Sequence, residues 1–295
     1  MIHAHTAYGL TFHLSFPCPI LPPAEADAQP DVTVVEGAVP RQLTAPVAQD
    51  RTWEAEPGRF LLRAGDHAGR FLVERGHRIT LQRSASADED ALGFHFLDSV
   101  LAATLRQNGL LVLHANAVAT PQGARAVSGI SGAGKSTTTA ALLQRGCTLL
   151  ADDLTVVRPG PDGVLEVLPG VPQFSLCEDA MDRSHRPVAG LSRHRRCRHK
   201  FVVPARAEMA NRPVPLRALY LLQSHPGKDV RVRRVTGAEK FSAVQDAIYG
   251  PLLPQEHPAQ FPLFATLARQ VAVFRLERPE NLWTVDAVAE VLLRG

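Results

Sequence analysis

Residues 129–136 combine three glycines, a lysine and a serine at the spacing of a phosphate-binding loop. They read Gly129-Ile130-Ser131-Gly132-Ala133-Gly134-Lys135-Ser136 and match G-x-x-x-x-G-K-[ST] at every fixed position. Glycines let successive backbone N–H groups face one point, and a helix that follows them presents its positive end there. Because Lys135 can reach the β and γ phosphates, the loop predicts nucleotide binding.

A glycine-rich turn with an incidental lysine is the alternative. It is disfavoured because the chain holds only four lysines and otherwise uses arginine. The residues expected to contact the nucleotide are Gly129, Ser131, Gly132, Ala133, Gly134, Lys135, Ser136 and Thr137.

An acidic pair, Asp152-Asp153, follows an apolar segment at 147–151. Mg²⁺ bridges the β and γ oxygens of a bound nucleotide, and its usual protein partners are the loop Ser or Thr and an Asp at a neighbouring strand end. Ser136 and the acidic pair fit those roles. Two adjacent carboxylates can also divide labour, one toward the metal and one toward an attacking hydroxyl, as a kinase requires. The plainer alternative is a pair that caps a turn.

Two further groups of residues carry chemistry. His114 lies in the apolar segment before the loop, where a core histidine is the ordinary alternative, but a strand beside the loop would place its imidazole near the ligand. The basic run 193–200 is either a solvated loop, a site for an acidic peptide or nucleic acid, or a phosphate clamp. If it is a clamp, we expect Arg198 and Lys200 to close over the γ phosphate.

The elements that position these residues follow from hydrophobic periodicity. Period-two segments at 10–14, 31–35, 60–63, 70–74 and 78–81 predict a β-rich unit. Residues 88–105 form a helical pattern that opens with three acids and closes at Asn108-Gly109. Strands at 110–119 and 124–128, a helix to about 145 and a strand at 147–151 then predict the strand–loop–helix–strand core of a P-loop fold.

The rest of the chain predicts hairpins at 154–168, a strand at 216–222, helices at 238–249 and 259–269, a strand at 271–276 and a helix at 285–293. The expected fold class is α/β, with a P-loop domain preceded by a smaller β-rich domain. We place the β-rich domain at 1–86, a linking helix at 87–109 and the P-loop domain at 110–295.

Composition limits the function classes. The 295 residues are 45% hydrophobic with a formal net charge of +3, which is typical of a globular protein and not of a dedicated nucleic-acid binder. The nearly neutral charge predicts no nucleic-acid partner. Four scattered cysteines and the absence of a leader-like or membrane-spanning segment predict a cytoplasmic protein with reduced thiols and no membrane partner. Around Cys197 no tetrahedral set of zinc ligands emerges.

In combination, four segments resemble the catalytic core of bacterial HPr kinase/phosphorylase. These are His114-Ala115, the loop 129–136, Gln144-Arg145-Gly146 and Leu150-Ala151-Asp152-Asp153. The resemblance covers about residues 110–156. It implies that Lys135 and Ser136 hold ATP and Mg²⁺, and that one of the two aspartates is the catalytic base. It also implies that the other aspartate and His114 support the metal and the phosphate. Of the two, we assign Asp152 as the base and Asp153 to the metal.

Departures from that family bear on the substrate. Thr137 stands where HPr kinases carry an acidic residue, and their downstream Glu-Arg-Gly-Leu-Gly segment is absent. Both weigh against HPr as the substrate and against the phosphorylase reaction. The β-rich front and the linking helix look closer to shorter HPr-kinase-related proteins, some of which phosphorylate a serine at the end of a lasso-peptide precursor.

These features predict an ATP- and Mg²⁺-dependent kinase that phosphorylates a serine on a peptide or small protein. The alternatives are a small-molecule hydroxyl kinase and a nucleotide-binding switch or sensor without transfer. GTP as the donor and a homo-oligomeric state stay open.

Overall fold

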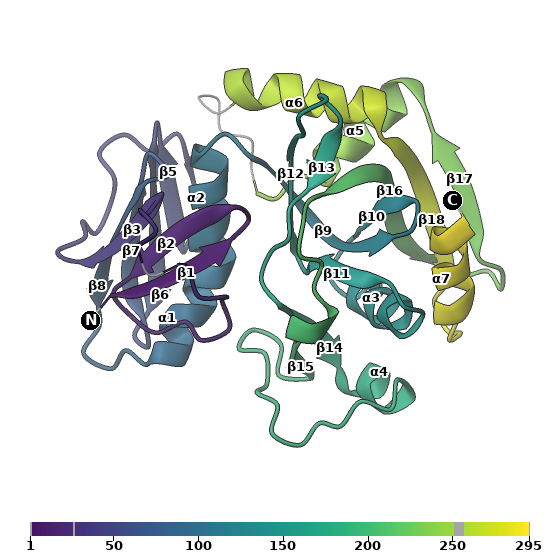
Figure 1. Cartoon of the computed structure of the whole chain (residues 1–295), viewed down its shortest axis with the longest axis horizontal. Helices are drawn as coiled ribbons and strands as arrows, with labels where there is room; N and C mark the ends of the chain where they lie inside the picture. Colours follow the sequence, from purple (N-terminus) through teal and green to yellow (C-terminus); the bar gives the residue numbers. More distant parts are fainter. Residues whose placement is uncertain (1, 26, 251–256, 295) are drawn as a thin grey trace. The chain divides into compact units, whose positions relative to one another are not determined.

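The computed structural model describes residues 2–25, 27–250 and 257–294, which fall into two compact units (Figure 1). The first unit comprises Met1–Val112 and Gly250–Phe261, and the second comprises Leu113–Tyr249 and Pro262–Gly295. The chain is a mixed α/β protein with several sheets, as predicted. The domain limits given above stay predictions.

An eight-stranded sheet forms the body of the first unit, in the order β1-β2-β3-β8-β7-β6-β5-β4. The strands predicted from alternation are present, and β1, β4 and β5 were not predicted. Their bounds are β1 His3–Ala7, β2 Leu10–Leu14, β3 Val32–Glu36, β4 Ala48–Gln49, β5 Trp53–Glu56, β6 Arg59–Gly65, β7 Gly69–Glu74 and β8 Arg78–Arg83.

The helical segment of this unit begins where its capping residues predict. Asp88 accepts a hydrogen bond from the N–H of Ala91, which satisfies one of the free donors of the first turn. The segment runs through α1 (Glu89–His95), a π-helical turn η1 (Phe96–Val100) and α2 (Leu101–Gln107). Phe96 packs edge-on against Phe12 of β2 and against Phe16, which follows that strand. These aromatic contacts fix the helix against the sheet.

The second unit contains a sheet in the order β10-β9-β12-β13-β16-β18-β17, with β11 paired to β9 and β10 also paired to β16. All the predicted strands are present, whereas the edge strand β17 was not predicted because four of its five residues are exposed. The bounds are β9 Leu111–Thr120, β10 Gly123–Ser128, β11 Thr148–Ala151, β12 Leu154–Pro159, β13 Leu165–Val167, β16 Val214–His225, β17 Arg231–Val235 and β18 Ala272–Pro279.

Strand direction in this sheet decides where functional groups meet. Both β10 and β11 pair with β9 in antiparallel fashion, so they run parallel to each other on either side of it. The strands β16 and β18 are parallel to β10. Consequently β10, β11, β16 and β18 all end at the same edge of the sheet, and β9 begins there.

Helix α3 (Lys135–Gln144) connects β10 to β11 and ends at Arg145-Gly146, as predicted. It packs against α7 (Val285–Arg294) and against β14 (Gln173–Cys177), which forms a separate two-stranded sheet with β15 (Lys200–Pro204). Apolar side chains of these elements, together with some from β11 and β18, form one buried cluster that includes Leu142, Leu149, Phe174, Leu276 and Leu292.

The remaining helices are α4 (Glu178–Arg183), the short η2 (Arg206–Glu208), α5 (Gly237–Asp246) and α6 (His257–Gln270). Helices α5 and α6 correspond to two predicted helices. In the described part of the chain, no helix combines the length and hydropathy that crossing a bilayer requires.

Candidate nucleotide and phosphoryl-transfer site

The predicted phosphate-binding loop (residues 129–136, the phosphate loop) follows β10 and leads directly into α3. Gly129, Gly132 and Gly134 have φ values of 154°, 84° and 110°, which L side chains rarely adopt. At Gly129 a Cβ atom would lie 2.3 Å from the carbonyl oxygen of Leu222, so no other residue fits there. The loop therefore has the backbone shape for which its glycines were predicted, at the amino end of a ten-residue helix.

Lys135 is the first residue of α3, and its ammonium lies at the centre of the site. Its Nζ donates to the carbonyl oxygen of Gly129 at 2.8 Å and lies 3.3 Å from Nε2 of His114. Burial lowers the pKa of Lys135, while the charges of Asp153 and Asp152 act in the opposite direction. The two carboxylates therefore lie close enough to compensate a buried cation.

His114 reaches the site from β9. A lysine ammonium has no acceptor, so a hydrogen bond from Lys135 to Nε2 requires the proton of a neutral His114 to be on Nδ1. Since β9 is antiparallel to its neighbours, His114 lies in the first half of its strand and not at a carboxyl end. The neighbouring strand thus carries the imidazole in its amino half and not at the carboxyl end that we expected.

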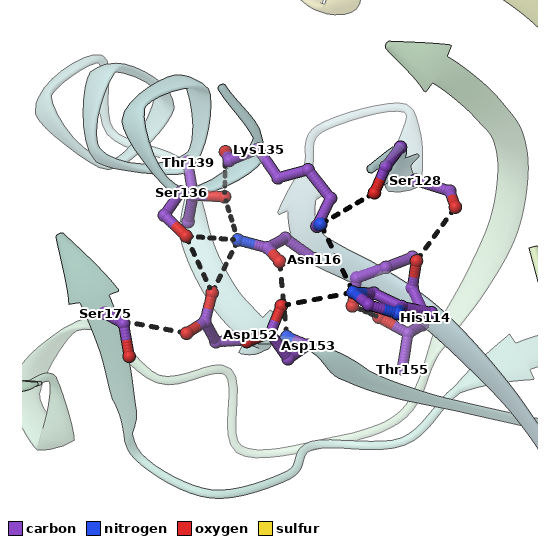
Figure 2. A network of polar contacts seen from close by, with 12 residues as sticks. His114, Asn116, Ser128, Lys135, Ser136, Thr139, Asp152, Asp153, Thr155 and Ser175 are labelled. Atoms are coloured by element: carbon purple, nitrogen blue, oxygen red, sulfur yellow. Dashed lines mark hydrogen bonds and ion pairs between the residues drawn. The ribbon is translucent and has the colours of Figure 1, made fainter. Parts of the chain in front are cut away.

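Asp152 lies between β11 and β12 with both carboxylate oxygens engaged (Figure 2). Oδ1 accepts from Nδ2 of Asn116 at 2.6 Å and from Oγ of Ser136 at 3.4 Å, and Oδ2 accepts from the N–H of Ser175 at 2.8 Å. Burial, followed by the charge of Asp153, raises the pKa of Asp152 to about 8. The three hydrogen bonds hold the carboxyl group toward Ser136 at the start of α3.

Asp153 lies in a different environment. Its backbone has a φ of 60°, which is uncommon for a residue other than glycine. Its side chain is 47% exposed, and Oδ1 lies 3.8 Å from Nε2 of His114, whose side chain is 43% exposed. A molecule approaching from solvent can therefore reach Asp153.

Asn116 and Ser175 were not predicted from the sequence. Asn116 lies two residues after His114 on β9, and residues i and i+2 of a strand share a face, so this spacing was the available signal. Ser175 lies on β14 and acts through its backbone N–H, so nothing in its side chain could indicate the contact.

The two basic residues predicted to contact phosphate have different positions. Lys200 begins β15 opposite Cys177, and its positive charge lowers the pKa of both Asp152 and Lys135, which places it beside the site. Arg198 has an exposed side chain, and its carbonyl oxygen accepts from Arg193. Among the described contacts none joins its guanidinium to the two aspartates, so its phosphate role stays a prediction.

Arg278 is a further residue that the sequence did not indicate. It lies near the end of β18, and its Nε donates to the carbonyl oxygen of Ala133 at 2.7 Å. Its Nη2 donates to the carbonyl oxygen of Gly132 at 3.3 Å. Arg278 therefore fixes two carbonyl groups of the phosphate loop, although it lies 146 residues after Gly132 in the sequence.

The donor groups suit magnesium. Ser136 offers a hydroxyl and Asp152 a carboxylate, 3.4 Å apart, and hard oxygen donors are the ligands that Mg²⁺ prefers. Within the described residues no group of three or more His, Cys, Asp and Glu side chains is placed to hold a metal ion. Mg²⁺ in phosphoryl-transfer sites commonly takes one or two protein ligands and completes its shell with phosphate oxygens and water.

Comparison with known proteins gives a distant likeness. No family model and no curated protein matches the chain. Among solved structures, the chain is similar to the HPr(Ser) kinase/phosphatase from Coxiella burnetii, with 12% identity and a TM-score of 0.31 over 62% of this chain and 93% of that one. At this TM-score and identity the match assigns no role to any residue, so the roles proposed below depend on the site geometry alone.

Proposed function

We propose that this protein is an ATP- and Mg²⁺-dependent kinase that transfers the γ phosphate to a hydroxyl group. The observation that carries the proposal is the convergence of four side chains: Lys135 and Ser136 from the phosphate loop and α3, and Asp152 and Asp153 from the end of β11. They lie in one network of polar contacts (Figure 2). Phosphoryl transfer depends mainly on positioning and charge neutralisation, which such a set supplies.

The loop and Lys135 would hold the β and γ phosphates, and Ser136 with Asp152 would hold the magnesium ion. When bound, the ion would neutralise charge on the phosphate oxygens. Asp152 suits this role because its carboxylate is already fixed by Asn116 and Ser175 and faces the Ser136 hydroxyl. Loss of hydration, which raises its pKa, would be compensated by the positive charge of a bound ion.

Asp153 is the residue that we propose as the catalytic base. This reverses the division that we assigned from the sequence, where Asp152 was the base and Asp153 a metal ligand. The reason is access, since the side chain of Asp153 is 47% exposed while both oxygens of Asp152 are engaged. Nε2 of His114 lies 3.8 Å from Oδ1 of Asp153, so the imidazole ring would pack beside this carboxylate and limit its rotation.

In the transfer step the acceptor oxygen forms a bond to the γ phosphorus, and the bond between that phosphorus and the β–γ bridging oxygen breaks. The hydroxyl proton passes to Asp153. ADP leaves with the bridging oxygen, whose developing negative charge the ammonium of Lys135 would stabilise.

For the acceptor we propose a serine on a peptide or small protein, and the end of a lasso-peptide precursor is the specific case to test first. The exposed Asp153 and His114 support an acceptor that arrives as part of a chain, because such a substrate needs open access. A small-molecule hydroxyl kinase and a nucleotide switch without transfer are the competing functions.

The test is a transfer assay with γ-labelled ATP, Mg²⁺ and peptides that end in serine, with matched peptides that end in alanine. We expect label in the serine peptides alone. Label in a free hydroxyl metabolite but in no peptide would favour the small-molecule kinase. Hydrolysis of ATP without any labelled acceptor would favour the switch.

Lys135→Ala should weaken binding of a non-hydrolysable ATP analogue by about 10- to 100-fold, because a charge-assisted contact to phosphate contributes roughly 1.5–3 kcal/mol. Isothermal titration calorimetry measures the change. Lys240→Ala on α5 is the matched control and should bind as the original chain does. Equal affinity in all three proteins would remove Lys135 from the phosphate site.

Arg278→Met should weaken the same binding by about 10-fold, because Gly132 and Ala133 lose the donors that fix their carbonyls and the loop must then be ordered by the ligand. The maximal transfer rate at saturating ATP should change little. Arg275→Met serves as the control, because Arg275 lies on the same strand as Arg278 and its replacement removes an ion pair to Glu239 of α5. A large fall in the maximal rate with unchanged affinity would contradict this account of Arg278.

A further inference from the structure

Asn116 is the most connected residue of the site and belongs to none of its sequence motifs. It lies on β9 and is 1% exposed. Its Nδ2 donates to Oδ1 of Asp152 at 2.6 Å and to Oγ1 of Thr139 at 3.1 Å, and Oγ of Ser136 lies 3.5 Å away. Its Oδ1 accepts from the backbone N–H of Asp153 at 3.2 Å. Figure 2 shows the amide between α3 and the strand end that carries the aspartates.

The orientation of this amide follows from its partners. Thr139 donates its hydroxyl proton to the carbonyl oxygen of Lys135, so its oxygen is an acceptor toward Asn116. Asp152 also offers an acceptor, and the N–H of Asp153 offers a donor. Rotating the amide by 180° would place its oxygen against a carboxylate and its NH₂ against an N–H. Only one orientation of Asn116 satisfies all three neighbours.

Each of these bonds acts on a group of the proposed reaction. The bond to Asp152 fixes the carboxylate beside Ser136. The bond from Asp153 holds a backbone whose φ of 60° is unfavourable for a side chain-bearing residue, and this backbone aims the Asp153 side chain toward His114. The bond to Thr139 connects both to α3, whose first residues carry Lys135 and Ser136.

We infer that Asn116 is a positioning residue that holds the two aspartates in place relative to the phosphate loop. Its amide binds the carboxylate of Asp152, the proposed metal ligand, without contacting the metal itself. The inference depends on the proposed function, because it assigns Asn116 to the same metal and acceptor groups. Groups that hold a metal ligand from behind determine metal affinity without touching the metal, and their loss commonly costs 10- to 100-fold.

The experiment compares Asn116→Leu and Asn116→Asp with the original chain. Leucine has a similar size and neither donates nor accepts, whereas aspartate keeps an acceptor for the N–H of Asp153 and places a second carboxylate against Asp152. Calorimetry measures the affinity for a non-hydrolysable ATP analogue with and without Mg²⁺, and transfer assays give kcat and KM. We expect the tightening of binding by Mg²⁺ to fall about 10- to 100-fold in both variants. Affinity without Mg²⁺ should stay within about threefold, and kcat should fall about 100-fold.

Thr155→Val is the matched control. Thr155 is fully buried on β12 and donates to the carbonyl oxygen of Ala115 at 2.6 Å, so its replacement removes a buried hydrogen bond beside the site without touching either aspartate. Thr139→Val is the second test variant, since it removes one acceptor of the Asn116 amide and keeps the side-chain shape. It should reduce the tightening of analogue binding by Mg²⁺ about threefold. If both Asn116 variants fail to fold, this variant tests the role of Asn116.

The outcomes separate this inference from the proposed function. If the variants keep the full effect of Mg²⁺ and differ from the original chain only in thermal stability, as Thr155→Val should, then Asn116 is structural and the inference is overturned. If the original chain binds the analogue with Mg²⁺ but labels no acceptor, the kinase proposal fails while the binding data still decide the role of Asn116. A chain that does not bind the analogue at all overturns both.

Discussion

Asp153→Asn will reduce kcat for phosphoryl transfer by about 100- to 10,000-fold, the range expected when a general base is lost, and it will leave the affinity for the ATP analogue with Mg²⁺ nearly unchanged. Asparagine keeps the size of the side chain and its approach to His114 but cannot accept the proton of the acceptor hydroxyl. Steady-state transfer kinetics and calorimetry on the same preparations measure the two quantities.

Asp162→Asn is the control for this prediction, since Asp162 is an exposed aspartate in the turn between β12 and β13. It should behave as the original chain does. If Asp153→Asn instead abolishes the effect of Mg²⁺ on binding, and Asp152→Asn reduces kcat alone, then the division of roles assigned from the sequence is the correct one.

The second large effect concerns Asp152 and pH. Burial and the charge of Asp153 raise its pKa from 3.8 to about 8, so the folded chain binds this proton more tightly than the unfolded chain does. The free energy of unfolding contributed by this group is therefore highest below about pH 4 and decreases as the pH rises toward about 8. A full shift would correspond to about 1.4 kcal/mol per pKa unit, and partial access of solvent to the site reduces this, so we expect a decrease of about 1–3 kcal/mol.

Urea unfolding at pH 5 and pH 8 in metal-free buffer measures this decrease, with Asp152→Asn as the comparison because its amide does not titrate. The variant should lose that part of the pH dependence, whatever its absolute stability. It should also lose transfer activity and the stabilisation that Mg²⁺ with ADP gives the original chain at pH 8. Parallel curves for the two proteins would mean that Asp152 titrates in the folded chain with an ordinary pKa.

Most of the individual elements could be predicted from local sequence. Asp88 caps α1 as its position before an acidic first turn indicates, and Gly146 ends the region of α3 as expected. The strand β17 was missed because three of its five residues are arginines and only its last residue, Val235, is buried. The π-helical turn η1 also lay beyond local reasoning, because periodicity does not distinguish it from the helices on either side.

Parts of the candidate site could also be predicted, because they depend on residues close together in the sequence. The phosphate loop is a continuous stretch whose backbone conformation depends on its own glycines, and all three of them have positive φ values. The acidic pair lies at the end of β11, where the motif places it. The exchange of roles between Asp152 and Asp153 could not be predicted, because adjacent residues of the same type differ here only in burial and in partners.

By itself, the sequence determined the phosphate loop, the helix that follows it and the acidic pair, because each depends on contacts between residues close together along the chain. Only the tertiary structure decided which groups surround them. Asn116, Ser175 and Arg278 meet the loop and the aspartates from β9, β14 and β18. Their meeting requires the strand order and the antiparallel direction of β9, and those are set by burial of a shared core that no single segment specifies.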